Sequence, residues 1–364
     1  MILGSYIPVK AEGVEIDLQA SHAVLISSTS GSVLFEKDSK SLYESSSMVK
    51  LMSVYTSSKL EDSTITYTNT EGLNNVLGLT DGMQCSKEDL MYATFYQGYE
   101  DCAYALGTQE DFVKNMNIQA DTLGLNDSVF VNAIGTSAEG QSVTAKDMAL
   151  VGAALAQDST LKDMYASTSY SPSTLTEGTV FNRDPIEYDG LVGFYDGIDS
   201  DGKYSCILSA KRDGTEVTAV VFQEESKEIA HAEAIKLLDY GLDNYKTIVV
   251  SKEEVGEKTE GNATYSLSQD LSLLMPIQTD ESKLKYSIEI TGEGDDAKGY
   301  VIFTLNEEEV GRVLLDKTVE ETKELSTTEK IVRVINYGCA VIAGVFIMVF
   351  VLRHGSAFIK PEGE

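Results

Sequence analysis

The spacing of apolar residues predicts a helix over residues 44–60, near the start of the chain. Four apolar side chains follow the i, i+3, i+4, i+7 spacing of one helix face: Met48, Leu51, Met52 and Tyr55. Ser47 and Lys50 lie in the same segment, three residues apart, and so about one helical turn from each other. The segment therefore places a hydroxyl and an amine on one face of a helix that is otherwise buried.

The segments around this helix alternate between strand and helix patterns. Residues 21–35 contain two β-rich runs joined by Thr29-Ser30-Gly31, which predicts a hairpin. The pattern predicts helices over residues 88–106, 112–123 (ended by Gly124), 144–155 and 229–240. It predicts further turns and strands over residues 193–197, 204–209 and 216–223. Strands at both ends with helices between them predict an α+β domain over residues 14–245, with one antiparallel sheet built from both ends.

After residue 245 the pattern changes to short strands with period-2 alternation. This predicts a small all-β domain over residues 246–319, followed by an acidic linker and helix start over residues 320–333. Residues 334–352 carry no charge and are long enough to cross a bilayer, so we expect one transmembrane helix. Residues 353–364 then form a short tail.

The N-terminus bears on location. Residues 1–11 end in Val9-Lys10-Ala11, which is typical of the end of a signal peptide, although the charged start and most of the apolar middle are missing. We interpret residues 1–13 as the remnant of a signal peptide, its first part missing because the start codon of the gene is placed too late. The other interpretation is that the likeness to a signal peptide is accidental. With export, the main domains lie outside the cell membrane and the tail lies in the cytoplasm. Without export, the chain is a tail-anchored cytosolic protein.

Charge and composition argue against several classes of function. The formal charge of −30 over 364 residues argues against binding nucleic acid or anionic lipid through a broad basic face. The three histidines give poor support to a zinc site or to a Ser-His-Asp triad. The four cysteines lack the spacing of metal ligands, so we expect no metal and no cofactor.

The pair Ser47 and Lys50 is the candidate chemistry. A lysine amine takes the proton of a serine hydroxyl when burial or neighbouring charges lower the lysine pKa. The spacing alone is not specific, because Ser200–Lys203 and Ser282–Lys285 share it. The sequence around Ser47 therefore has to show whether this pair differs from the other two.

Several blocks in order carry a family resemblance: GSVLFEKDSK, SSSMVKLMS, LGLTDGMQCSKEDLMYA, EDFVKNMN, LGLNDSVFVNAIG, SVTAKDMAL and LSAKRDG. Over residues 20–245, and more weakly in the β domain, the chain resembles the D-alanyl-D-alanine carboxypeptidases, the low-molecular-mass penicillin-binding proteins. The resemblance implies a β-lactamase/transpeptidase-like fold, an antiparallel sheet with helices on both faces. It also implies a peptidoglycan stem peptide as partner. Ser47 would be the nucleophile that forms an acyl-enzyme, and Lys50 its general base.

The other two motifs of that family are replaced. Gly98-Tyr99-Glu100 stands where the family has SxN, and Tyr195-Asp196-Gly197 where it has KTG. We expect Glu100 and Asp196 to raise the pKa of Lys50, and Asp196 to repel the substrate carboxylate. Losing a positioned proton relay costs about 10²–10⁴ in rate. In such a site Ser47 and Lys50 would remain as a structural hydrogen bond, or as a salt bridge to Glu100.

Two functions therefore remain. One is a membrane-anchored serine-type carboxypeptidase of weak activity that works with Ser47 and Lys50 alone. The other is a non-catalytic, wall-facing binding or scaffold protein that keeps the fold without the chemistry.

Overall fold

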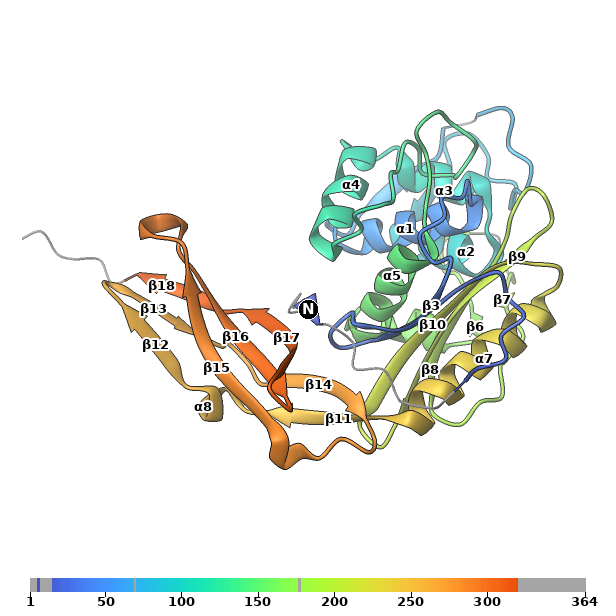
Figure 1. Cartoon of the computed structure of the whole chain (residues 1–364). Coiled ribbons are helices and arrows are strands. Elements are labelled where there is room, and N and C mark those ends of the chain that lie inside the picture. The colour runs from blue at the N-terminus through green and yellow to red at the C-terminus, as the bar shows by residue number, and fades with distance from the viewer. Residues whose placement is uncertain (1–4, 7–14, 69, 176–177, 320–364) are drawn as a thin grey trace, which may run out of the picture. The chain divides into compact units, whose positions relative to one another are not determined.

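The computed structural model describes residues 5–6, 15–68, 70–175 and 178–319 (Figure 1). These residues divide into two compact units. The first comprises the described residues up to Lys258 together with Tyr265–Asp316, and the second comprises Thr259–Thr264 and the described residues from Lys317 onward. The first unit contains the predicted α+β domain.

A five-stranded antiparallel sheet forms the centre of the α+β domain, with its strands in the order β3-β2-β10-β9-β8. The strands are β2 (His22–Ser27), β3 (Val33–Lys37), β8 (Leu191–Ile198), β9 (Tyr204–Arg212) and β10 (Thr215–Glu224). Two strands come from the start of the domain and three from its end. The predicted sheet built from both ends of the chain is confirmed.

Side chains alternate between the two faces of this sheet, as the pleat of a strand requires. On β2, Val24 and Ile26 join the core beneath α1 (Ser46–Ser58) and α5 (Ala145–Gln157), whereas Ala23 and Leu25 join the core beneath α7 (Lys227–Asn244). Figure 1 shows α1 and α5 on one side of the sheet and α7 on the other. The expected arrangement of helices on both faces is confirmed.

The helix expected over residues 88–106 is in fact two helices, α2 (Lys87–Gln97) and α3 (Glu100–Gly107). The break falls at Gly98, whose φ of 65° lies in the left-handed region that glycine adopts without strain. Its N–H caps α2 by donating to the Thr94 carbonyl. The prediction of one continuous stretch was therefore wrong, and the turn that divides it carries site residues.

The other helices follow the sequence pattern closely. α4 (Phe112–Leu123) ends at Gly124, with φ 75°, as the sequence predicts. α5 begins after Thr144, whose side chain accepts a hydrogen bond from the Asp147 N–H. The short elements of the domain are α6 (Lys162–Ala166), β4 (Thr64–Thr66), β5 (Gln84–Ser86), β6 (Ser169–Tyr170) and β7 (Phe181–Asn182).

Most of the described residues after α7 lie in strands. Strand β11 (Tyr245–Val250) pairs with β14 (Leu271–Pro276), and β15 (Leu284–Thr291), β16 (Lys298–Leu305) and β17 (Glu308–Leu314) form an antiparallel sheet. The free edge of β17 pairs with β1 (Ser5–Tyr6). The remaining elements are α8 (Lys252–Val255), β12 (Glu257–Glu260), β13 (Ala263–Ser266), η1 (Glu281–Lys283), η2 (Gly294–Asp296) and β18 (Asp316–Val319). The sequence predicts no strand for β12 or β14.

Several predicted segments lie outside the described residues: the linker 320–333, the membrane span 334–352, the tail 353–364 and most of residues 1–13. Within the part of the chain that is described, no helix has the length and apolar character needed to cross a membrane. The domain limits at residues 13, 245 and 319 stay predictions.

Helix α5 packs closely against the sheet at Gly152, and a substitution there tests this packing. A Cβ on Gly152 would overlap Ile207 Cγ2 and lie 3.0 Å from Thr218 Cγ2. Overpacking of a core costs about 1–3 kcal/mol, and the helical preference of alanine returns up to about 1 kcal/mol. We expect Gly152→Ala to lower the free energy of unfolding by about 1–2 kcal/mol in a urea titration.

The matched control is Gly241→Ala on α7. A Cβ there would meet the end of the flexible Leu25 side chain at 2.8 Å, so we expect a smaller loss. Equal losses at the two positions would contradict the packing described for α5.

Candidate active site

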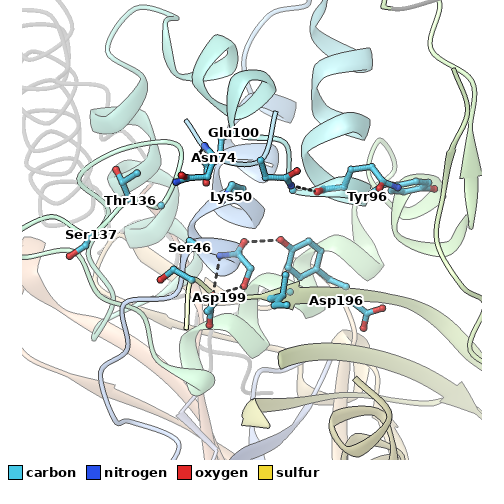
Figure 2. A pocket seen from close by; sticks show the side chains of 18 residues that line it. Ser46, Lys50, Asn74, Tyr96, Glu100, Thr136, Ser137, Asp196 and Asp199 are labelled. Carbon is cyan, nitrogen blue, oxygen red and sulfur yellow. Dashed lines mark hydrogen bonds between the residues drawn. The ribbon is translucent and has the colours of Figure 1, made fainter. Parts of the chain in front are cut away.

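All seven residues that the sequence singled out line one pocket of about 650 Å³ (Figure 2). They come from α1, from the turn between α2 and α3 with the first residue of α3, and from β8: Ser47, Lys50, Gly98, Glu100, Tyr195, Asp196 and Gly197. The structure thus brings together Ser47 and Gly197, which are 150 positions apart in the chain.

The first turn of α1 positions the candidate nucleophile. Ser45 is the N-cap, and its hydroxyl accepts a hydrogen bond from the Met48 N–H at 3.3 Å. Ser47 and Lys50 follow within the same helix, and they are only 6% and 5% exposed. Both side chains that the family chemistry requires are therefore held on a regular, buried helix.

A residue that the sequence did not single out occupies the centre of the site. Asp199, just after the end of β8, accepts at Oδ1 from the Ser47 hydroxyl at 3.0 Å and from the Ser47 N–H at 3.3 Å. The Ser45 hydroxyl donates to the same oxygen at 2.8 Å, and Gln223 Nε2 donates to Oδ2 at 3.1 Å. Burial raises the pKa of Asp199 above its usual range, although these hydrogen bonds act in the opposite direction.

Strand β8 lies directly against Ser47. A Cβ on Gly197 would overlap the Ser47 hydroxyl oxygen, so only glycine fits there. The Tyr195 hydroxyl donates to the Ser47 carbonyl at 2.7 Å, and its ring packs against Phe95 with centroids 5.0 Å apart. Tyr195 is 2% exposed and therefore belongs to the core under the pocket floor.

Lys50 differs from its prediction in two ways. Among the described residues its Nζ makes no hydrogen bond and no ion pair, so the expected contacts with Ser47 and Glu100 are absent. Burial lowers the pKa of Lys50, and the charges of Glu100 and Asp199 oppose this effect without overcoming it. The predicted rise of the pKa was wrong because desolvation outweighs the nearby anions.

Glu100 is the first residue of α3 and joins the pocket wall to a neighbouring loop. Its Oε2 accepts from the Asn74 N–H at 2.8 Å, and its own N–H donates to the Asn75 carbonyl at 2.6 Å. Figure 2 shows Glu100 and Asn74 on one side of Lys50, and Ser46 and Asp199 on the other. The Glu100 carboxylate therefore belongs to the pocket, as the sequence predicts.

The Asp196 carboxylate does not point into the pocket. Because side chains alternate along β8, it faces α7, where it pairs with His231 Nε2 at 2.5 Å and Lys227 Nζ at 3.1 Å. Burial acts to raise the Asp196 pKa, but the two basic partners outweigh it and hold the pKa below its usual range. The predicted repulsion of a ligand by Asp196 was therefore wrong, and the carboxylate beside Ser47 is that of Asp199.

Period-2 alternation contained a signal for Asp199 that the sequence interpretation did not use. Residues 195, 197 and 199 fall on one side of an extended chain, so a glycine and an acid share the side of Tyr195. The other polar and loop residues of the pocket gave no such signal: Asn74, Asn75, Gly135, Thr136 and Ser137 in loops, and Gln97 at the end of α2. Within the described ranges, no cluster of three or more His, Cys, Asp or Glu side chains could hold a metal ion.

Comparison with known proteins gives the same class as the geometry. The chain matches the D-alanyl-D-alanine carboxypeptidase family over residues 9–226. It is 25% identical to D-alanyl-D-alanine carboxypeptidase DacF of Bacillus subtilis over 345 residues, 85% of this chain and 87% of DacF. It is 27% identical to DacC of Escherichia coli over 271 residues, 66% of this chain and 67% of DacC.

Solved structures share the fold. Penicillin-binding protein 5 from Haemophilus influenzae gives a TM-score of 0.67 at 18% identity, covering 84% of this chain and 98% of its own. Penicillin-binding protein 6B from Escherichia coli gives 0.64 at 23% identity, covering 86% and 99%. The α+β transpeptidase fold followed by a C-terminal β domain is thus that of low-molecular-mass penicillin-binding proteins. This chain belongs to the D-alanyl-D-alanine carboxypeptidase family, serine-type peptidases that act on peptidoglycan stem peptides.

The raised pKa of Asp199 has a consequence for stability. Between the ordinary aspartate pKa and the raised native value, the folded protein binds more protons than the unfolded chain, so its stability falls as the pH rises through that interval. A neutral amide at this position would have no such penalty. We expect the stability of Asp199→Asn relative to the unmodified protein to increase as the pH rises above the ordinary aspartate pKa of about 4.

Urea unfolding across that range measures the difference, with the exposed Asp62→Asn as the control. A stability difference that stays constant with pH would show that Asp199 is not held in the buried contact with Ser47.

Proposed function

We propose that this protein is a membrane-anchored member of the family whose carboxypeptidase activity is lost or strongly reduced, and which binds a wall peptide without efficient turnover. The observation that carries the proposal is the contact of Asp199 Oδ1 with both the hydroxyl and the N–H of Ser47. One buried carboxylate thus occupies both groups of the nucleophile that acyl transfer uses.

The occupied N–H matters because the transition state of acyl transfer is an oxyanion. Serine hydrolases stabilise it with main-chain N–H groups, including that of the nucleophile, and losing one donor costs about 10²–10³ in kcat. Here the Ser47 N–H donates to Asp199 at 3.3 Å. An oxyanion formed there would also meet the negative charge of that carboxylate whenever Asp199 is ionised.

The proton relay is incomplete as well. A general base lies within about 2.6–3.2 Å of the group it deprotonates, or acts through one water. The Ser47 hydroxyl is hydrogen-bonded to the Ser45 hydroxyl and to Asp199 Oδ1. Among the described residues, Lys50 Nζ makes no hydrogen bond with the hydroxyl of Ser45 or of Ser47. Gly98 and Tyr195 bring no second relay hydroxyl beside Ser47, because Gly98 has no side chain and the Tyr195 hydroxyl donates to a carbonyl.

One observation favours the alternative, a weak serine-type carboxypeptidase that works with Ser47 and Lys50 alone. Burial lowers the pKa of Lys50, and a neutral amine is the form that acts as a base. In that case the Asp199 contact would have to open when the substrate binds. The two functions differ in whether a covalent adduct forms on Ser47.

Covalent labelling separates these functions. We expect a fluorescent penicillin to label the full-length protein at least about 10² more slowly than an active family member, so that no stoichiometric adduct accumulates in the time that fully labels the active member. Ser47→Ala is the control for adducts at other residues. Stoichiometric labelling that disappears in Ser47→Ala would establish the weak carboxypeptidase instead.

A gain-of-function variant tests the physical reason in the same assay. It combines Asp199→Thr with four further changes: Gly98→Ser, Glu100→Asn, Tyr195→Lys and Asp196→Thr. We expect labelling only when Asp199 is replaced together with the other four. Labelling by the four changes without Asp199→Thr would show that the carboxylate does not block Ser47.

The anchor is the second part of the proposal. The uncharged residues 334–352 have the length of a membrane span, and with export the main domains lie outside the membrane with residues 353–364 in the cytoplasm. We expect the full chain to stay with membranes after an alkaline carbonate wash and a chain ending at residue 333 to be released. Release of both would remove the anchor from the proposal.

A further inference from the structure

The charge of the pocket is opposite to what a carboxylate ligand needs. Four charged residues line it: Lys50, Glu100, Asp196 and Asp199. The Asp196 carboxylate is balanced by Lys227 and His231 on the other face of the sheet. The pocket interior is left with one amine and two carboxylates, inside a chain of formal charge −30. A cation is therefore favoured there over an anion.

Two polar groups in this pocket lack the partners they would have in a closed core. Lys50 is 5% exposed, and its Nζ has no hydrogen-bond acceptor among the described residues. Glu100 Oε2 accepts from the Asn74 N–H, whereas no donor from the described part of the chain reaches Oε1. Both atoms face the pocket, so a ligand that displaces water there can supply an acceptor to Lys50 and a donor to Glu100.

Asp199 offers a ligand no free oxygen. Its Oδ1 already accepts three hydrogen bonds and its Oδ2 accepts one from Gln223. Glu100 is therefore the carboxylate that can contact a ligand directly, and Asp199, when ionised, adds to the preference for positive charge from the opposite side of Lys50 (Figure 2).

We propose that this pocket binds a peptide that carries a primary ammonium group and has no free carboxylate. The ammonium donates to Glu100, and a peptide carbonyl accepts from Lys50. The proposal deepens the proposed function, on which it rests, because a ligand that is not turned over need not present a scissile, carboxylate-terminated bond. The pocket volume of about 650 Å³ suits a short peptide segment.

Other ligands fit the pocket less well. A free terminal carboxylate would face the Glu100 and Asp199 charges with only Lys50 to hold it. Among divalent cations, calcium would need six or more oxygen ligands. The described residues contain no acidic or histidine cluster of metal-binding size. The amides of Asn75 and Gln97 and the hydroxyls of Thr136 and Ser137 suit the main chain of a peptide.

Three synthetic peptides that differ in one group test the ligand class by isothermal titration calorimetry with the full-length protein in detergent. The first is acetyl-L-lysyl-D-alanine carboxamide, the second is its free acid, and the third has its lysine side chain acetylated. We expect the first to bind about tenfold more tightly than the other two, the factor that one charge-assisted hydrogen bond contributes. The preference should fall as salt is added.

Variants assign the contacts. Glu100→Gln should reduce the affinity for the ammonium peptide to that of the acetylated peptide, whereas Glu139→Gln, an exposed position outside the pocket lining, should leave it unchanged. Lys50→Met should weaken both carboxamides alike, because both present the same carbonyl.

Tighter binding of the free acid, equal binding of all three peptides, no binding of any, or an unchanged preference in Glu100→Gln would each overturn the inference. These outcomes are distinct from failure of the proposed function. Penicillin labelling on Ser47 would refute the loss of activity even where the ammonium preference stands, and absent labelling without that preference would refute the ligand class alone.

Discussion

The contact between the end of β8 and the first turn of α1 is the constraint on which the site depends. Strand β8 and the residue after it engage Ser47 on three sides: Tyr195 donates to its carbonyl, Gly197 lies against its side chain, and Asp199 accepts from its hydroxyl and N–H. Each contact involves a different group of one residue. Ser47 is thus a packing point between the sheet and the helices as well as a candidate nucleophile.

The other face of β8 is also held in place, by ion pairs with α7. Asp196 pairs with Lys227 and His231 of α7, so the strand is tied to the helix behind it while its front lies on α1. The side chains of Tyr195 and Asp196 make their contacts within the fold, with the Ser47 carbonyl and with α7. Strand β8 is therefore held from both of its faces where it forms a wall of the pocket.

The electrostatics of the pocket follow from burial more than from the number of charges. Lys50 has two carboxylates near it, and its pKa is nevertheless lowered because desolvation is the larger effect. Asp199 shows the same balance with the opposite sign, since burial raises its pKa against several hydrogen bonds. Both groups are driven toward their neutral forms. Glu100, which meets the loop at Asn74, is left as the carboxylate available to a ligand.

The sequence by itself determined the order of strands and helices, the family, and the seven positions that share the pocket, because periodicity and ordered blocks are local properties of the chain. It failed where one residue changed the local geometry, as at Gly98, which divides the helix expected over residues 88–106. Only the tertiary structure decided that Asp196 turns toward α7, that Asp199 reaches Ser47 from 152 residues away, and that burial sets the pKa of Lys50. These features depend on which elements pack together and how much water they exclude, and neither quantity is contained in the spacing of residues along the chain.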